Sequence, residues 1–111
     1  MLNYQLDQVF HALADPTRRR ILERLSAGET SVSDLARPLD MSLAAVVQHV
    51  QVLQRSGLVR SRKRGRVRTC RIESEALRAA EGWLSQRRAL WARRLDRLGT
   101  LLAEQQKGTR K

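Results

Sequence analysis

The chain has 111 residues, 41% of them hydrophobic, and a formal net charge of +11. This length is enough for one globular domain, and the charge indicates a polyanionic partner. No apolar run approaches the about 18 residues that span a bilayer, so we expect no membrane segment. Residues 1–10 are too polar for a secretory signal, and the single cysteine, Cys70, cannot form an intrachain disulfide. Both features favour a cytoplasmic protein.

The basic residues are concentrated in one segment. Eight of the 22 Lys and Arg residues, and none of the 11 Asp and Glu residues, lie between Met41 and Ile72. A protein that is merely soluble and basic seldom excludes acidic residues from a segment so completely. The distribution therefore predicts a nucleic-acid partner.

The first two helices follow from hydrophobic residues at helical spacing. This period predicts a first helix over about 5–14. Asp15 and Pro16 are the predicted N-cap and first position of a second helix, which ends at Gly28. Three consecutive arginines on this helix point in three directions and cannot form one patch. We favour a structural role for them, with a phosphate contact by one as the alternative: Arg18, Arg19 and Arg20.

A helix-turn-helix is predicted over about 31–56. Ser31 and Ser42 are the expected N-caps of its two helices, with Asp34 as the capping-box partner of Ser31. Pro38 keeps the first of these helices short. The second helix is expected to bury one stripe, formed by Leu43, Val46, Val50 and Leu53.

A β-hairpin follows directly. Residues 58–62 and 67–72 alternate with a period of two, and residues 63–66 between them contain Gly65. A hairpin at this place in a helix-turn-helix protein is a wing.

The last predicted helix, over about 74–105, is long for a domain of this size. Two rows of residues recur along it every seven positions, which predicts pairing with a second helix. The alternative is that the helix folds back on its own domain. The predicted dimerisation residues are Leu77, Leu84, Trp91, Leu95, Leu98 and Leu102.

These elements predict a mainly α fold with a small β-hairpin wing, dimerising through the long C-terminal helix. We assign residues 1–105 to a single winged helix-turn-helix domain, and residues 106–111 to a flexible basic tail.

Several motifs occur in an order that resembles the ArsR family of winged-helix repressors. They are Asp15–Leu22, Ser33–Ala36, Met41–Val50, Val52–Leu53 and Ser56–Val59. The resemblance implies a homodimer paired through its terminal helices. It also implies a pseudo-palindromic operator in double-stranded DNA, often in the protein's own promoter, and repression by blocking polymerase.

The exposed face of the second helix of the helix-turn-helix is the predicted reader of base edges. Small residues at its start allow close approach to the groove floor, and Gln48 can bond N6 and N7 of adenine. Ser42 and the nearby backbone amides can hold a phosphate. For His49, at the edge of this face, a phosphate contact and packing between helices are both open. The predicted DNA-binding residues here are Ser42, Ala44, Ala45, Gln48, His49, Gln51 and Arg55.

The wing carries further basic residues, which we expect to give affinity and register more than sequence choice. An arginine at its tip could enter the minor groove, where the negative potential is strong. Arg60 and Arg71 belong to this basic hairpin, and we expect Arg66 and Arg68 to share one of its faces. The wing residues predicted to bind DNA are Arg62, Lys63, Arg64, Arg66 and Arg68.

The sequence predicts no metal site and no cofactor. Metal-sensing members of the ArsR family carry cysteines in the third helix, where this chain has Ser31 and Ser33, and serine is a poor ligand for soft ions. Other members bind zinc through Asp and His on the terminal helix, but the two histidines here, His11 and His49, lie elsewhere. The sequence leaves three sources of induction open: a small molecule, a partner protein, or a change in the concentration of the repressor alone.

Cys70 admits two interpretations. Nearby arginines could lower the pKa of the thiol and make it a redox switch. The chain has no second cysteine to resolve an oxidised thiol, so we favour a small strand residue packed against the body of the protein.

Other functions explain less of the sequence. A winged helix acting on RNA, or nonspecifically on DNA, is the main alternative, but RNA readers stack bases on exposed aromatics. The aromatic residues lie outside the basic segment. A protein-interaction adaptor would need no segregation of charge. The sequence shows no nucleophile–base pair and no phosphate-binding loop, so we do not expect an enzyme.

Overall fold

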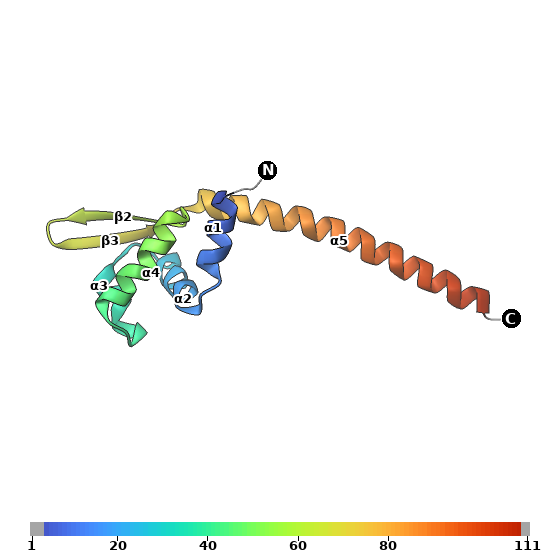
Figure 1. Cartoon of the computed structure of the whole chain (residues 1–111), viewed down its shortest axis with the longest axis horizontal. Coiled ribbons are helices and arrows are strands. Elements are labelled where there is room, and N and C mark those ends of the chain that lie inside the picture. The colour runs from blue at the N-terminus through green and yellow to red at the C-terminus, as the bar shows by residue number, and fades with distance from the viewer. Residues whose placement is uncertain (1–3, 110–111) are drawn as a thin grey trace. The chain divides into compact units, whose positions relative to one another are not determined.

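The computed structural model describes the backbone of residues 4–109 and the side chains of residues 5–107. The chain forms two compact units, one extending to Ala80 and the other beginning at Glu81. The elements are α1 (Tyr4–Leu13), α2 (Pro16–Ser26), β1 (Thr30–Ser31), α3 (Val32–Ala36), a 3₁₀ turn η1 (Arg37–Leu39), α4 (Leu43–Arg55), β2 (Val59–Arg64), β3 (Val67–Ile72) and α5 (Ser74–Thr109). Figure 1 labels all of them except β1 and η1.

The predicted caps begin three of these helices. The side chain of Asp15 accepts a hydrogen bond from the backbone N–H of Arg18 at the start of α2. Ser31 and Ser42 do the same for α3 and α4, each across 3.1 Å. These bonds satisfy N–H groups that have no partner within the helix.

The arginines of α2 bond to backbone carbonyls. Arg18 donates to the carbonyl oxygens of Ala12 at 2.8 Å and His11 at 3.0 Å, and Arg19 donates to that of Leu13 at 2.7 Å. These three carbonyls belong to the last turn of α1, which the cations also stabilise through the helix dipole. The bonds support the structural interpretation of the arginine run.

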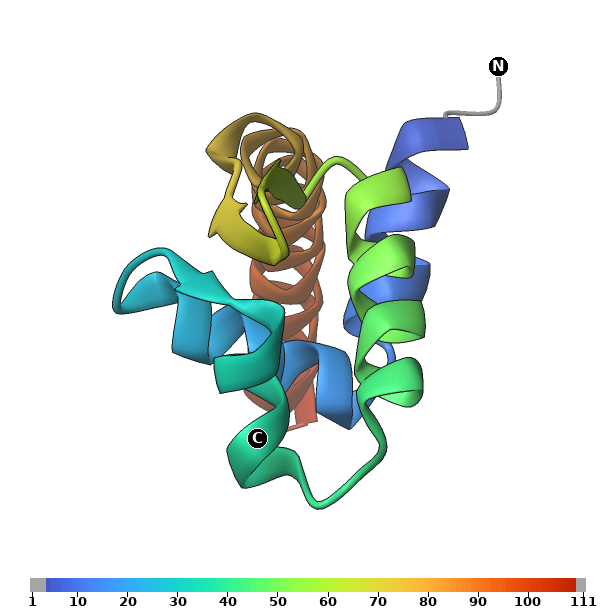
Figure 2. The ribbon, with the colours of Figure 1, turned by 90° about the vertical axis from the view of Figure 1, so that its left-hand side faces the viewer.

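The helices pack around one core in the first unit. Figure 2 shows α1 in blue beside α4 in green, and the two helices are in contact. Val46, Val50 and Leu53 of α4 are buried, as predicted. The prediction for Leu43 is wrong, because 52% of its surface is exposed. Leu43 is the first residue of α4, so it lies almost one turn beyond the point at which the helix enters the core.

The three strands form an antiparallel sheet in the order β1-β3-β2. The wing is the β2–β3 hairpin, which extends beyond the helices (Figure 1). Its turn is shorter than predicted, because Arg64 pairs with Val67 and only Gly65 and Arg66 lie between the strands. Gly65 has a φ of +60°, which glycine adopts without strain. Sequence patterns gave no sign of β1, whose two residues pair with Cys70 and Thr69.

Helix α5 is longer than predicted. It continues to Thr109, through residues assigned above to a flexible tail, and residues 110–111 lie outside the described part. Gln and Lys are good helix formers, which accounts for the extension. The predicted dimerisation residues on α5 are all at least 44% exposed. No helix in the described range is both long and apolar enough to cross a membrane.

Candidate nucleic-acid interface

One face of α4 is open to solvent. Its exposed residues include most of those predicted to read DNA, while Ala45 is half-buried. Small residues begin this face, and amides and a guanidinium follow one or two turns later. The exposed members of the predicted set are Ser42, Ala44, Gln48, Gln51 and Arg55.

His49 lies on the flank of α4 that packs against α2. Its Nδ1 is 3.3 Å from Nη1 of Arg18 and 4.0 Å from Oδ2 of Asp15, and 22% of its side chain is exposed. A guanidinium can only donate, so Nδ1 accepts the bond from Arg18. These contacts favour the packing interpretation of His49 over a phosphate contact.

Asp15 is held as a carboxylate at the same junction. The backbone N–H of Arg18, above all, lowers the pKa of Asp15. Burial is the next largest effect and opposes the shift, and the charge of Arg18 adds to the lowering. The N-cap of α2 thereby links the start of that helix to the flank of α4.

The pairing of β2 with β3 determines on which of the two faces of the hairpin each basic residue lies. Cross-strand partners point to the same side of a sheet. Arg66 lies in the turn, so the expectation that it shares a strand face with Arg68 is wrong. One face carries Arg60, Arg62, Arg64 and Arg71, and the other carries Ser61, Lys63, Arg68 and Cys70.

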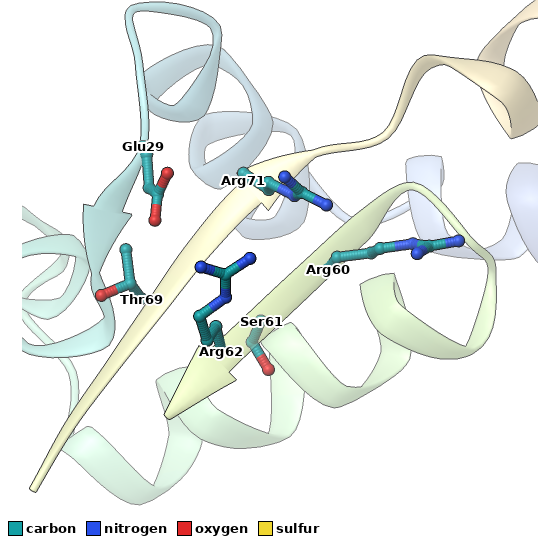
Figure 3. Close-up of a pocket in the computed structure, with 6 residues that line it drawn as sticks. All are labelled: Glu29, Arg60, Ser61, Arg62, Thr69 and Arg71. Atoms are coloured by element: carbon teal, nitrogen blue, oxygen red, sulfur yellow. The ribbon is translucent and has the colours of Figure 1, made fainter. Parts of the chain in front are cut away.

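The carboxylate of Glu73 partly neutralises the base of the wing. Glu73 lies 3.5 Å from Nε of Arg60 and 3.8 Å from Nε of Arg71. Glu29, Arg62 and Arg71 are among the residues that line a hollow of about 290 Å³ over β3, and Figure 3 shows their side chains. Within the described side chains, no acidic residue forms an ion pair with the remaining wing cations, which are Arg62, Lys63, Arg64, Arg66 and Arg68.

A hydroxyl group joins the wing to α4. Ser61 Oγ accepts hydrogen bonds from Nε2 of Gln54 at 2.6 Å and from Nη1 of Arg68 at 2.8 Å. Gln54 is on α4 and Arg68 is on β3, so these bonds orient the hairpin relative to the helix. Arg68 therefore has a positioning role in addition to its charge.

Cys70 is fully buried in β3. Burial raises the pKa of its thiol, and Glu29 adds to this, while Arg68 opposes it. A thiol of this kind is a poor nucleophile, so the structure favours packing over redox sensing.

The described residues contain no group of three His, Cys, Asp or Glu side chains arranged to hold a metal ion. Ser31 and Ser33 stand where metal-sensing members of the family carry cysteines. In the structure Ser31 caps α3, and Ser33 is exposed to solvent in the same helix.

Three apolar residues near the polar face were not among the predicted site residues. Leu43 and Val67 are 52% and 53% exposed, and both line a cleft of about 350 Å³ with Val47 of α4. Leu43 and Val47 are one helical turn apart. The position of Leu43 directly after its N-cap was the one sequence signal for its exposure, since a first helical turn often lies outside the core.

Similarity to known proteins agrees with this geometry. A family model described as a helix-turn-helix domain matches residues 13–62. The HTH-type transcriptional regulator Rv2034 of Mycobacterium tuberculosis is 38% identical over 96 residues, which cover 86% of this chain and 87% of the relative.

Solved structures extend the similarity to the whole fold. The crystal structure of the ArsR family transcriptional regulator RHA00566 matches with a TM-score of 0.76 at 51% identity, over 79% of this chain and 97% of that one. A homodimeric winged helix-turn-helix DNA-binding domain from Mycobacterium bovis, solved by NMR, matches with a TM-score of 0.60 at 28% identity. The match covers 84% of this chain and 83% of that one. These relatives are regulators or DNA-binding domains, and the expectation of a non-enzyme agrees with them. The chain belongs to the ArsR family of winged helix-turn-helix transcriptional regulators.

Proposed function

We propose that the protein is a homodimer that binds a pseudo-palindromic operator in double-stranded DNA and represses transcription, including that of its own gene. The observation that carries the proposal is the exposed face of α4 next to a wing whose outer cations form no ion pair with any acidic side chain that the structure describes. In this arrangement α4 enters the major groove and the wing follows the backbone or the minor groove.

Sequence choice would come from α4. Gln48 and Gln51 are exposed one turn apart, and a glutamine amide can bond adenine in a bidentate way. The wing would supply a contribution that depends on salt and little on sequence, because Lys and Arg release counterions from phosphates.

The dimer rests on α5. Leu84, Trp91, Leu95, Leu98 and Leu102 are about half exposed or more, although their heptad spacing is typical of a helix that pairs. The M. bovis relative is a homodimer. A two-fold dimer would present two copies of α4 to successive major grooves, about 34–36 Å apart.

The control of repression would not use thiolate-bound metal. Ser31 and Ser33 occupy the segment in which metal-sensing family members have cysteines, and Ser31 Oγ already accepts a bond from Asp34. Hydroxyl oxygen does not replace thiolate for soft ions.

The test is a fluorescence-anisotropy titration of the full chain against a duplex from upstream of its own gene and a scrambled duplex, at several salt concentrations. Light scattering on the same sample gives the oligomeric state. We expect a dimer that prefers the upstream duplex by about 10³ or more. Equal, steeply salt-dependent binding to both duplexes would contradict autoregulation and favour a general nucleic-acid role, on RNA or on DNA.

Gln48→Ala sharpens the test. The substitution should cost about 1–3 kcal/mol on the preferred duplex and little on the scrambled one. Arg64→Ala is the matched wing variant. This substitution should lower the affinity for both duplexes equally and reduce the slope of log K against log salt concentration by about one.

A further inference from the structure

The cleft described above has an apolar side formed by Leu43, Val47 and Val67, and it is here termed the apolar cleft after them. The rest of its lining is mostly polar or charged and consists of Ser31, Val32, Ser33, Asp34, Arg37, Arg66 and Arg68. Half of the Leu43 side chain is exposed, although Val46 in the next turn is completely buried. Val67 on the wing is equally exposed. Large apolar side chains that face water at a binding surface commonly mark a contact.

The apolar cleft adjoins the surface that carries the polar readers. Leu43 and Val47 form one stripe of α4, and the neighbouring stripe is Ala44, Gln48 and Gln51, all exposed. The wing side of the cleft brings the cations Arg66 and Arg68 close to the same apolar atoms. A duplex held by these cations and by Gln48 would cover Leu43.

The chemistry of the major groove then limits what Leu43 can touch. Base edges there present hydrogen-bond donors and acceptors, with one apolar group among them, the C5-methyl of thymine. Covering a donor or acceptor with a leucine leaves it without water and without a partner, which is unfavourable. A thymine methyl against Leu43 removes apolar surface from water on both sides.

We infer that Leu43, with Val47 beside it, selects a thymine in each half-site of the operator by contact with its C5-methyl group. The inference rests on the proposed function and adds an apolar reader to the polar one. Leu43 is then a second specificity-determining residue beside Gln48, and Val67 lines the cleft from the side of the wing.

The experiment removes one methyl group at a time. The full chain first selects duplexes from a random library, and each thymine of the preferred duplex is then replaced in both half-sites by deoxyuridine, which lacks only the methyl. Burial of one methyl corresponds to about a fourfold change in affinity, so a symmetric pair should weaken binding about fifteenfold at the contacted position.

The same duplexes are then titrated with two variants. Leu43→Ala should bind the thymine and deoxyuridine duplexes equally, and it should fold normally because Leu43 lies outside the core. Gln51→Ala is the control from the neighbouring stripe: it should lower affinity for both duplexes and keep their ratio.

The outcomes separate the two proposals. Failure of the library to yield any preferred duplex overturns sequence-specific binding, and this inference with it. A preferred duplex that tolerates deoxyuridine at every position overturns the inference alone. A deoxyuridine effect that persists in Leu43→Ala assigns the methyl contact to another residue and overturns the role of Leu43.

Discussion

Arg18 offers a direct test of how α4 is held. Its guanidinium donates to the carbonyls of Ala12 and His11 and to Nδ1 of His49, so one side chain joins the end of α1 to the flank of α4. A charged hydrogen bond contributes up to about 1.5–3 kcal/mol, and partial exposure reduces this. Arg18→Ala should therefore lower the free energy of unfolding by about 2–3 kcal/mol.

The loss should be visible in thermal and urea unfolding. For a domain of this size, about 2–3 kcal/mol corresponds to a fall in Tm of roughly 10 °C or more. Protein concentration must be equal in all samples, because pairing would stabilise the fold by mass action. Arg20→Ala is the matched control. The bond that Arg20 donates to the carbonyl of Pro38 is exposed and 3.4 Å long, so its loss should cost less than about 0.5 kcal/mol.

DNA binding distinguishes the structural role from a phosphate contact. If Arg18 is structural, the folded variant should keep the wild-type dependence of log K on log salt. If Arg18 binds phosphate, the slope should fall by about one while stability changes little. Stability within about 0.5 kcal/mol of wild type, together with a reduced slope, would refute the reasoning.

Three further predictions follow from the described contacts. The lowered pKa of Asp15 means that its carboxylate stabilises the fold above the ordinary pKa of an aspartate, and that this contribution is lost as the pH falls through the lowered pKa. In urea unfolding, the excess stability of wild type over Asp15→Asn should therefore be constant above about pH 5 and shrink below about pH 4. A difference in stability that does not depend on pH would contradict this prediction. Trp91→Glu combined with Leu98→Glu should give folded monomers in sedimentation, since both side chains are exposed, and an intact dimer would refute pairing through α5. Cys70 should react with a thiol reagent about a hundredfold more slowly in the native protein than in urea, because it must first be exposed by opening of the sheet, and equal rates would show that it is accessible.

The sequence predicted features that depend on a few neighbouring residues. The caps at Ser31 and Ser42 are three-residue patterns, and both were found where expected. The strand at Thr30 could not be predicted, because a two-residue strand has no period and pairs with Cys70, forty residues later. Leu43 was assigned to the core because a period does not say where along a helix the core ends.

The candidate site shows the same division between local and distant causes. Exposure of Gln48 and Gln51 follows from the hydrophobic stripe of α4 alone. The sequence did not indicate which wing cations form ion pairs. Glu73, which pairs with Arg60 and Arg71, lies outside the hairpin segment. Counting charge in the segment from Met41 to Ile72 therefore overstates the field at the base of the wing, and the positive potential is concentrated nearer its tip.

The two flanks of α4 are fixed by unlike means, and this bears on how specific binding would be achieved. On one flank His49 receives a hydrogen bond from Arg18, and on the other Gln54 donates to Ser61 of the wing. A reader helix that could rotate about its axis would exchange Gln48 for a neighbouring side chain in the groove, since residues one position apart differ by about 100° on a helix. Contacts on both flanks prevent this rotation without using any residue of the exposed face. Residues of the exposed face can therefore be replaced without loss of these contacts, while Arg18, His49, Gln54 and Ser61 keep the orientation of the face constant.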